Sequence, residues 1–68
     1  MKRFQIVLTD PKTQETKIRN IERYNFPEAA SKASFLCRAE WEKTKNDSWI
    51  VAAIYDMDYK FDIGKQVT

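Results

Sequence analysis

Residues 25–45, NFPEAASKASFLCRAEWEKTK, are the stretch that decides the fold. Their apolar residues recur at the three- and four-residue spacing of a helix. Asn25 could cap this helix with Glu28 reaching back to it, or Phe26 could be the boundary with Pro27 at the first helical position. Either start predicts a helix from about residue 27 to residue 45.

The predicted helix has one apolar side and one polar side. The apolar side carries Ala29, Ala30, Ala33, Leu36, Cys37 and Trp41. The opposite side carries Ser31, Phe35, Arg38, Glu42 and Lys45. Cys37 is therefore expected in the core. Glu40 lies next to the apolar side near the helix end, where its side chain is expected to reach water.

Two strands are predicted before the helix. The first alternates Phe4, Ile6 and Leu8 with more polar residues, and Val7 adds an apolar side chain to its other face. A type I turn beginning at Asp10 then leads into a strand over residues 16–21.

The second strand does not alternate regularly. Ile18 is its clearest inward residue, but Ile21 stands three positions later, which strict alternation does not allow. A bulge or a strand end near Asn20 would reconcile the two positions.

Residues 49–55, WIVAAIY, predict a third strand that is apolar at nearly every position. The order strand, strand, helix, strand predicts a two-layer α+β domain, with the first strand in the middle of a mainly antiparallel sheet and the helix across one face. A chain of 68 residues leaves room for one such domain, with residues 58–68 as a flexible or arm-like tail.

A single helix covers only one face of this sheet, so the third strand should leave apolar residues on the other. The smaller residues Ile50, Ala52 and Ile54 fit best under an Ala-rich helix. The uncovered face would then carry Trp49, Tyr55, Tyr59 and Phe61, the last two if the tail is ordered, and would bind a protein partner or a second copy of the chain. Alternatively, the tail covers this face, or the rings lie flat across a merely amphipathic sheet.

Phe35 is a second candidate for partner binding. It lies about opposite the apolar centre of the helix and one turn before Arg38, and an exposed aromatic ring beside an arginine is typical of an interface hot spot. The competing interpretation is a single exposed ring without a role.

The charges offer an alternative function. The chain has 12 basic and 10 acidic residues, and the basic ones concentrate in the N-terminal hairpin. Lys12, Lys17, Arg19 and Arg23 could follow the phosphates of DNA or RNA. A solvated edge strand uses Lys and Arg in the same positions to prevent aggregation.

The composition argues against an enzyme, a metal site and a cofactor site. There is no His, one Cys, and one Gly at position 64, so the usual general base, a zinc site and a phosphate-binding glycine loop are all excluded. Asp56, Asp58 and Asp62 do not fit a calcium loop, because Lys60 and Phe61 occupy the positions of an oxygen ligand and the glycine. A lone Cys and the lack of a long apolar run predict a cytoplasmic protein without membrane contact.

The opening strand FQIVL, the helix start PEAA at residues 27–30 and AEW at residues 39–41 give the chain a resemblance to a known group. It resembles the small strand–strand–helix–strand proteins with which phages take over host machinery, such as the RNA polymerase inhibitor of T7-like phages. The arginines that such an inhibitor carries on its last strand are absent here, where Asp56 and Asp58 stand, so no functional residue is carried over. The resemblance implies a binder in the host cytoplasm that occludes a larger partner protein.

The sequence therefore favours a small non-enzymatic protein-binding module, an inhibitor or regulator, with homodimer formation as a further expectation. The alternative is a DNA- or RNA-binding regulator that uses the basic hairpin. A structural subunit of a larger assembly is the third hypothesis.

Overall fold

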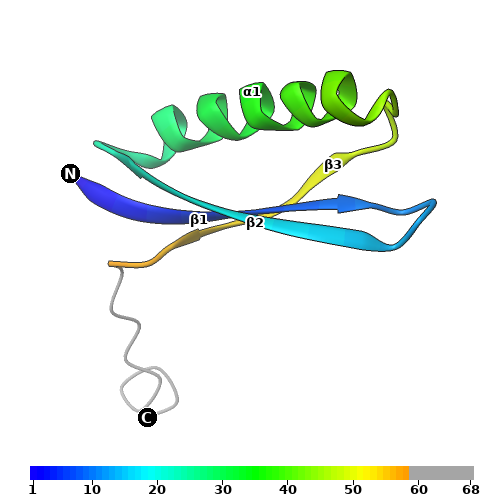
Figure 1. Cartoon of the computed structure of the whole chain (residues 1–68). Coiled ribbons are helices and arrows are strands. Elements are labelled where there is room, and N and C mark those ends of the chain that lie inside the picture. The colour runs from blue at the N-terminus through cyan, green and yellow to red at the C-terminus, as the bar shows by residue number, and fades with distance from the viewer. Residues whose placement is uncertain (59–68) are drawn as a thin grey trace, which may run out of the picture.

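The computed structural model describes residues 1–58. Three strands and one helix follow in the order β1 (Lys2–Asp10), β2 (Glu15–Arg23), α1 (Phe26–Thr44) and β3 (Ile50–Asp56). The strands form one antiparallel sheet in the spatial order β2-β1-β3, and α1 covers one of its faces (Figure 1). The predicted two-layer α+β fold, with the first strand in the middle, is confirmed.

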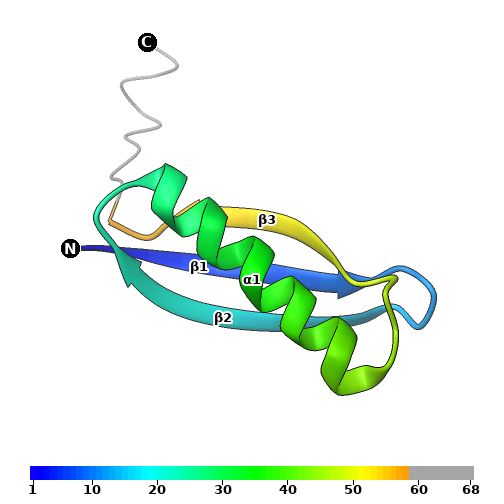
Figure 2. The ribbon, with the colours of Figure 1, turned by 90° about the horizontal axis from the view of Figure 1, so that it is seen from above.

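The helix begins as one of the two sequence alternatives predicted. Asn25 is the N-cap, and its side-chain oxygen accepts a hydrogen bond of 3.0 Å from the Glu28 N–H. Lys45 ends the helix in the left-handed conformation with φ of 58°. Figure 2 shows that α1 crosses the sheet obliquely, so that its last turns lie over β2.

The core lies between α1 and the sheet. Ile6 and Leu8 of β1 are buried in one cluster with Ala33 and Cys37 of the helix and with Trp49. Phe4 and Ala29 are buried as well. Burial raises the pKa of the Cys37 thiol, which donates a hydrogen bond of 3.1 Å to the Trp49 carbonyl oxygen. The expectation that Cys37 is a core residue is confirmed.

A β-bulge in β3 decides which residues of this strand face the helix. Leu8 lies opposite Val51 and Val7 lies opposite Ala53, so Ala52 is an extra residue without a partner on β1. The extra residue reverses the alternation of the strand. Before it, Trp49 and Val51 face the core; after it, Ile54 faces the core and Tyr55 points away.

The prediction that Trp49 lies on the uncovered face with Tyr55 is therefore wrong. Trp49 is 1% exposed and is the largest fully buried side chain of the core. Strict alternation puts residues 49 and 55 on one face, and the bulge at Ala52 separates them. Ile50, which was expected under the helix, is 51% exposed instead.

The orientation of Ile18 is also the reverse of the prediction. The pairing of β1 with β2 is regular over its whole length, without a bulge at Asn20. Ile21 packs against the core, whereas Ile18 lies on the other face and is 52% exposed. Lys17 and Arg19 occupy the helix-facing positions instead, where the carboxylate of Glu40 binds both.

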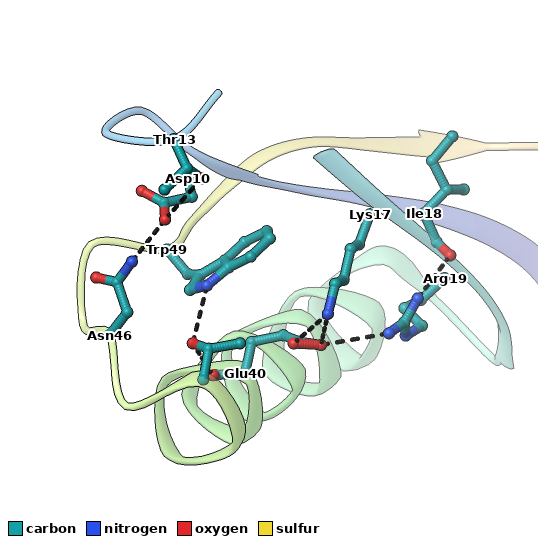
Figure 3. Close-up of polar contacts among 9 residues, drawn as sticks. Asp10, Thr13, Lys17, Ile18, Arg19, Glu40, Asn46 and Trp49 are labelled. Atoms are coloured by element: carbon teal, nitrogen blue, oxygen red, sulfur yellow. Dashed lines mark hydrogen bonds and ion pairs between the residues drawn. The ribbon is translucent and has the colours of Figure 1, made fainter. Parts of the chain in front are cut away.

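The Asp10 carboxylate joins the two turns at one end of the molecule. It accepts hydrogen bonds from Thr13 Oγ1 at 3.1 Å and from Asn46 Nδ2 at 2.6 Å (Figure 3). It also accepts hydrogen bonds from the Lys12 N–H at 2.9 Å and from the Ser48 hydroxyl. The Ser48 hydrogen bond is the main reason that the pKa of Asp10 lies below its ordinary value. The hairpin turn and the loop after α1 are held together by this one side chain.

We expect Asp10→Asn to lower the melting temperature at neutral pH, because the amide accepts fewer of these hydrogen bonds. A carboxylate with a lowered pKa in the folded state contributes stability above its ordinary value of 3.8, and this contribution is lost as the pH falls through the lower folded value. The difference between wild type and Asp10→Asn should therefore shrink below about pH 4. Thermal unfolding followed by circular dichroism from pH 7 to pH 2 measures it, and Asp47→Asn, at an exposed carboxylate of the same loop, is the control. Equal losses in both variants would contradict the role of Asp10.

Candidate functional site

The sheet face opposite α1, here called the open face, has an uncharged centre. Its centre consists of three cross-strand rows, Thr16–Thr9–Ile50, Ile18–Val7–Ala53 and Asn20–Gln5–Tyr55. None of these residues is charged, in a chain of which 32% is Asp, Glu, Lys or Arg. A face that merely contacts water would be expected to carry a share of these charges.

The open face carries three of the large apolar side chains that are exposed. Ile18, Ile50 and Tyr55 are 52%, 51% and 54% exposed, one from β2 and two from β3. Val7 and Ala53 lie between them in the central row and are partly buried. Tyr55 is exposed where the sequence placed it, whereas Ile18 and Ile50 were not recognised. Lys17 and Arg19 flank Ile18 in the sequence and therefore lie on the face opposite to it. The sequence does not show that these two cations face the helix, because that depends on their pairing with the buried Glu40.

Charged residues border this uncharged centre at one end of the sheet. The Arg3 guanidinium donates hydrogen bonds of 2.7 and 3.0 Å to the Asp58 carboxylate, which also accepts one of 2.7 Å from the Arg3 N–H. The hydrogen bond from the Arg3 side chain is the main reason that the pKa of Asp58 lies below its ordinary range. A hollow of about 500 Å³ lies beside this ion pair and is lined by Arg3, Phe4, Asn20, Ile21, Glu22 and Met57.

The basic residues of the hairpin do not form one surface. Lys17 Nζ lies 3.1 Å from both carboxylate oxygens of Glu40, and Arg19 Nη2 lies 3.3 Å from Oε1 (Figure 3). Lys17 Nζ also lies 5.4 Å from the ring centroid of Trp49. Two of the four residues proposed for nucleic-acid binding thus face the helix and are paired with an acid.

Glu40 corrects another expectation. Its side chain was expected to reach water, but the residue is 4% exposed and binds two cations. The helix ends over β2, so a long side chain at this position meets the basic strand before it reaches solvent (Figure 2). Pairing makes the burial of the carboxylate tolerable.

The remaining predicted residues lie apart from the open face. Lys12 is exposed in the hairpin turn, and Arg38 is exposed on α1. Arg23 lines a shallow groove of about 400 Å³ with Glu28, Ser31, Lys32 and Phe35. Phe35 is 66% exposed, as its helical position predicts, and Lys32 Nζ lies 4.9 Å from its ring centroid. Tyr59 and Phe61 lie outside the described residues.

We expect Glu40→Gln to lower the free energy of unfolding by about 1–3 kcal/mol, because it removes a charge that two partly buried cations share. Glu42→Gln is the matched control, since Glu42 is exposed on the same helix and should change stability by less than about 0.5 kcal/mol. Urea unfolding measures both. Equal stability of the two variants would show that the cluster contributes nothing.

Phe35→Ala should leave the free energy of unfolding within about 0.5 kcal/mol of wild type, because the ring is mostly exposed. Phe4→Ala, at a ring that is 1% exposed, should cost about 3–5 kcal/mol by the same measurement. A loss in Phe35→Ala that approached the loss in Phe4→Ala would mean that Phe35 is part of the core.

Other kinds of site find no support in the part of the chain that the structure describes. No group of three or more His, Cys, Asp or Glu side chains within residues 1–58 could hold a metal ion. Over the same residues, no helix combines the length and apolar character required to cross a membrane. No protein-family model, curated protein or solved structure matches the chain.

Proposed function

We propose that the chain is a small non-enzymatic protein-binding module, which inhibits or regulates a larger partner protein by covering part of its surface with the open face. The observation that carries this proposal is the uncharged centre of that face, with Ile18, Ile50 and Tyr55 each about half exposed. Protein interfaces are distinguished by a centre depleted in charge and a polar rim. The open face has such a centre, and the Arg3–Asp58 pair lies at its margin.

A protein partner fits this face better than a nucleic acid does. Binding to DNA or RNA depends on Lys and Arg that neutralise phosphates, and the three central rows contain neither. On the hairpin, Lys17 and Arg19 are already paired with Glu40. Breaking these pairs to bind a phosphate would leave the buried carboxylate without a partner, at a cost that opposes binding.

The open face of one copy is smaller than the contact surface of a stable complex. Three strands at roughly 4.8 Å spacing and nine residues at roughly 3.3 Å each give a face of about 400 Å². A stable protein complex buries about 800 Å² on each partner. One copy of the chain would therefore occlude a small part of the partner, as an inhibitor of one site does.

Affinity capture tests the proposal. Immobilised wild-type protein is incubated with lysate of the source cells, with and without nuclease, and the retained polypeptides are compared with those retained by Ile18→Lys. This substitution places a charge in the centre of the open face at an exposed position, so the fold should be preserved. Ser34→Lys, which adds the same charge at an exposed position of α1, is the matched control.

We expect a nuclease-resistant polypeptide that Ser34→Lys retains and Ile18→Lys loses. The charge that Ile18→Lys puts in the interface should raise the Kd for the purified partner at least about tenfold. Capture that nuclease abolishes would favour the nucleic-acid alternative. Capture that Ile18→Lys leaves unchanged would show that the open face is not the binding surface.

A further inference from the structure

The two edge strands of the sheet differ sharply in charge. β2 carries five charged residues among nine, Glu15, Lys17, Arg19, Glu22 and Arg23. β3 carries none from Ile50 to Tyr55, and Asp56 is the last residue of the strand. Charged residues on an edge strand discourage pairing with another chain, and an uncharged edge permits it. Only the β3 edge therefore lacks this protection.

The outer side of β3 is free within the described residues. β3 is hydrogen-bonded to β1 on one side and is last in the strand order. Figure 1 shows that α1 lies in a layer above the sheet, and in Figure 2 it runs from the β3 side toward β2. Within residues 1–58, no strand pairs with the outer side of β3. The backbone N–H and C=O groups of this side can thus pair with another strand.

We propose that β3 pairs antiparallel with β3 of a second copy of the chain, so that two three-stranded sheets join into one sheet of six strands. A two-fold axis makes this contact self-complementary, because the same strand is offered from both sides. We infer that the strand bound at this edge is β3 of a second copy, for two reasons. In an antiparallel β3–β3 pair, residues of the same face lie opposite each other, and no like charges meet.

The bulge at Ala52 selects one register. If Ile50 lies opposite Tyr55 of the second copy, both side chains are on the open face, and Val51 then lies opposite Ile54 on the helix side. The two-fold axis passes between Ala52 and Ala53, where small side chains allow close approach. Asp56 then lies opposite Trp49 of the second copy, and like charges do not meet.

Dimer formation also changes what the open face can bind. Two open faces of about 400 Å² each become neighbours in one surface of about 800 Å², which is the area a stable complex needs on each partner. This part of the argument rests on the proposed function, whereas the argument from the β3 edge does not.

Sedimentation equilibrium of the purified full-length chain, from micromolar to millimolar concentration, tests the proposal. We expect a monomer–dimer equilibrium whose dissociation constant rises at least about tenfold in Ala52→Lys, because two lysines then meet beside the axis. Ala52 is exposed and has no partner on β1, so the monomer should keep its fold, which circular dichroism checks. Asn20→Lys, exposed on the other edge strand, is the matched control and should dimerise as wild type does.

Cysteine cross-linking tests the register. An equimolar mixture of Ile50→Cys and Tyr55→Cys should form a disulfide-linked heterodimer on air oxidation, and either variant alone should form much less. Both positions are about half exposed, and the native Cys37 is buried. Equal cross-linking in the single variants and the mixture would overturn the register.

Several results would overturn the proposal itself. A chain that stays monomeric at all concentrations, or a dimer that Ala52→Lys leaves intact, would exclude pairing through β3. A dimer that Ile18→Lys abolishes and Ala52→Lys does not would be a face-to-face dimer. A full-length monomer that dimerises only after deletion of residues 59–68 would mean that these residues occupy the edge. The capture experiment is read separately from the edge results, but a face-to-face dimer would itself occupy the open face and would count against that face binding a different partner.

Discussion

A single helix covers a single face of the sheet, and the rest of the structure depends on this constraint. α1 buries Phe4, Ile6 and Leu8 of the central strand on one side. No second layer lies on the other side within residues 1–58 (Figure 1). Apolar residues on that side therefore stay exposed, and the function proposed above rests on this open face.

The ion cluster of Glu40, Lys17 and Arg19 allows the helix to pack against an edge strand that is basic. It lets two cationic side chains occupy helix-facing positions of β2, where apolar residues would otherwise be required. The same register turns Ile18 outward, beside Val7. One buried carboxylate on the helix thus both completes the core and places an apolar residue on the open face.

The bulge at Ala52 has the corresponding effect on β3. It lets Trp49 enter the core below the end of α1, where Trp41 Nε1 donates a hydrogen bond of 2.7 Å to the Trp49 carbonyl oxygen. Beyond the bulge, Tyr55 points away from the helix. The chain therefore buries Trp49 in the core and still leaves Ile50 and Tyr55 exposed on the open face.

Periodicity and turn chemistry in the sequence predicted the order of elements and the exposure of Phe35, and left Asn25 as one of two possible helix starts, because these features depend on residues close together in the chain. The middle position of the first strand followed from the rules for connecting successive elements. Only the tertiary structure decided whether the side chains of Trp49, Ile18 and Glu40 point into the core or toward solvent. Each of these depends on a contact between distant segments: one extra residue opposite β1, and a carboxylate that meets two cations 21 and 23 positions earlier in the chain. An alternating pattern of apolar residues does not reveal a β-bulge such as the one at Ala52. A count of charged residues does not reveal which cation pairs with which carboxylate. For that reason the sequence located an uncovered face but assigned part of it to the wrong residues.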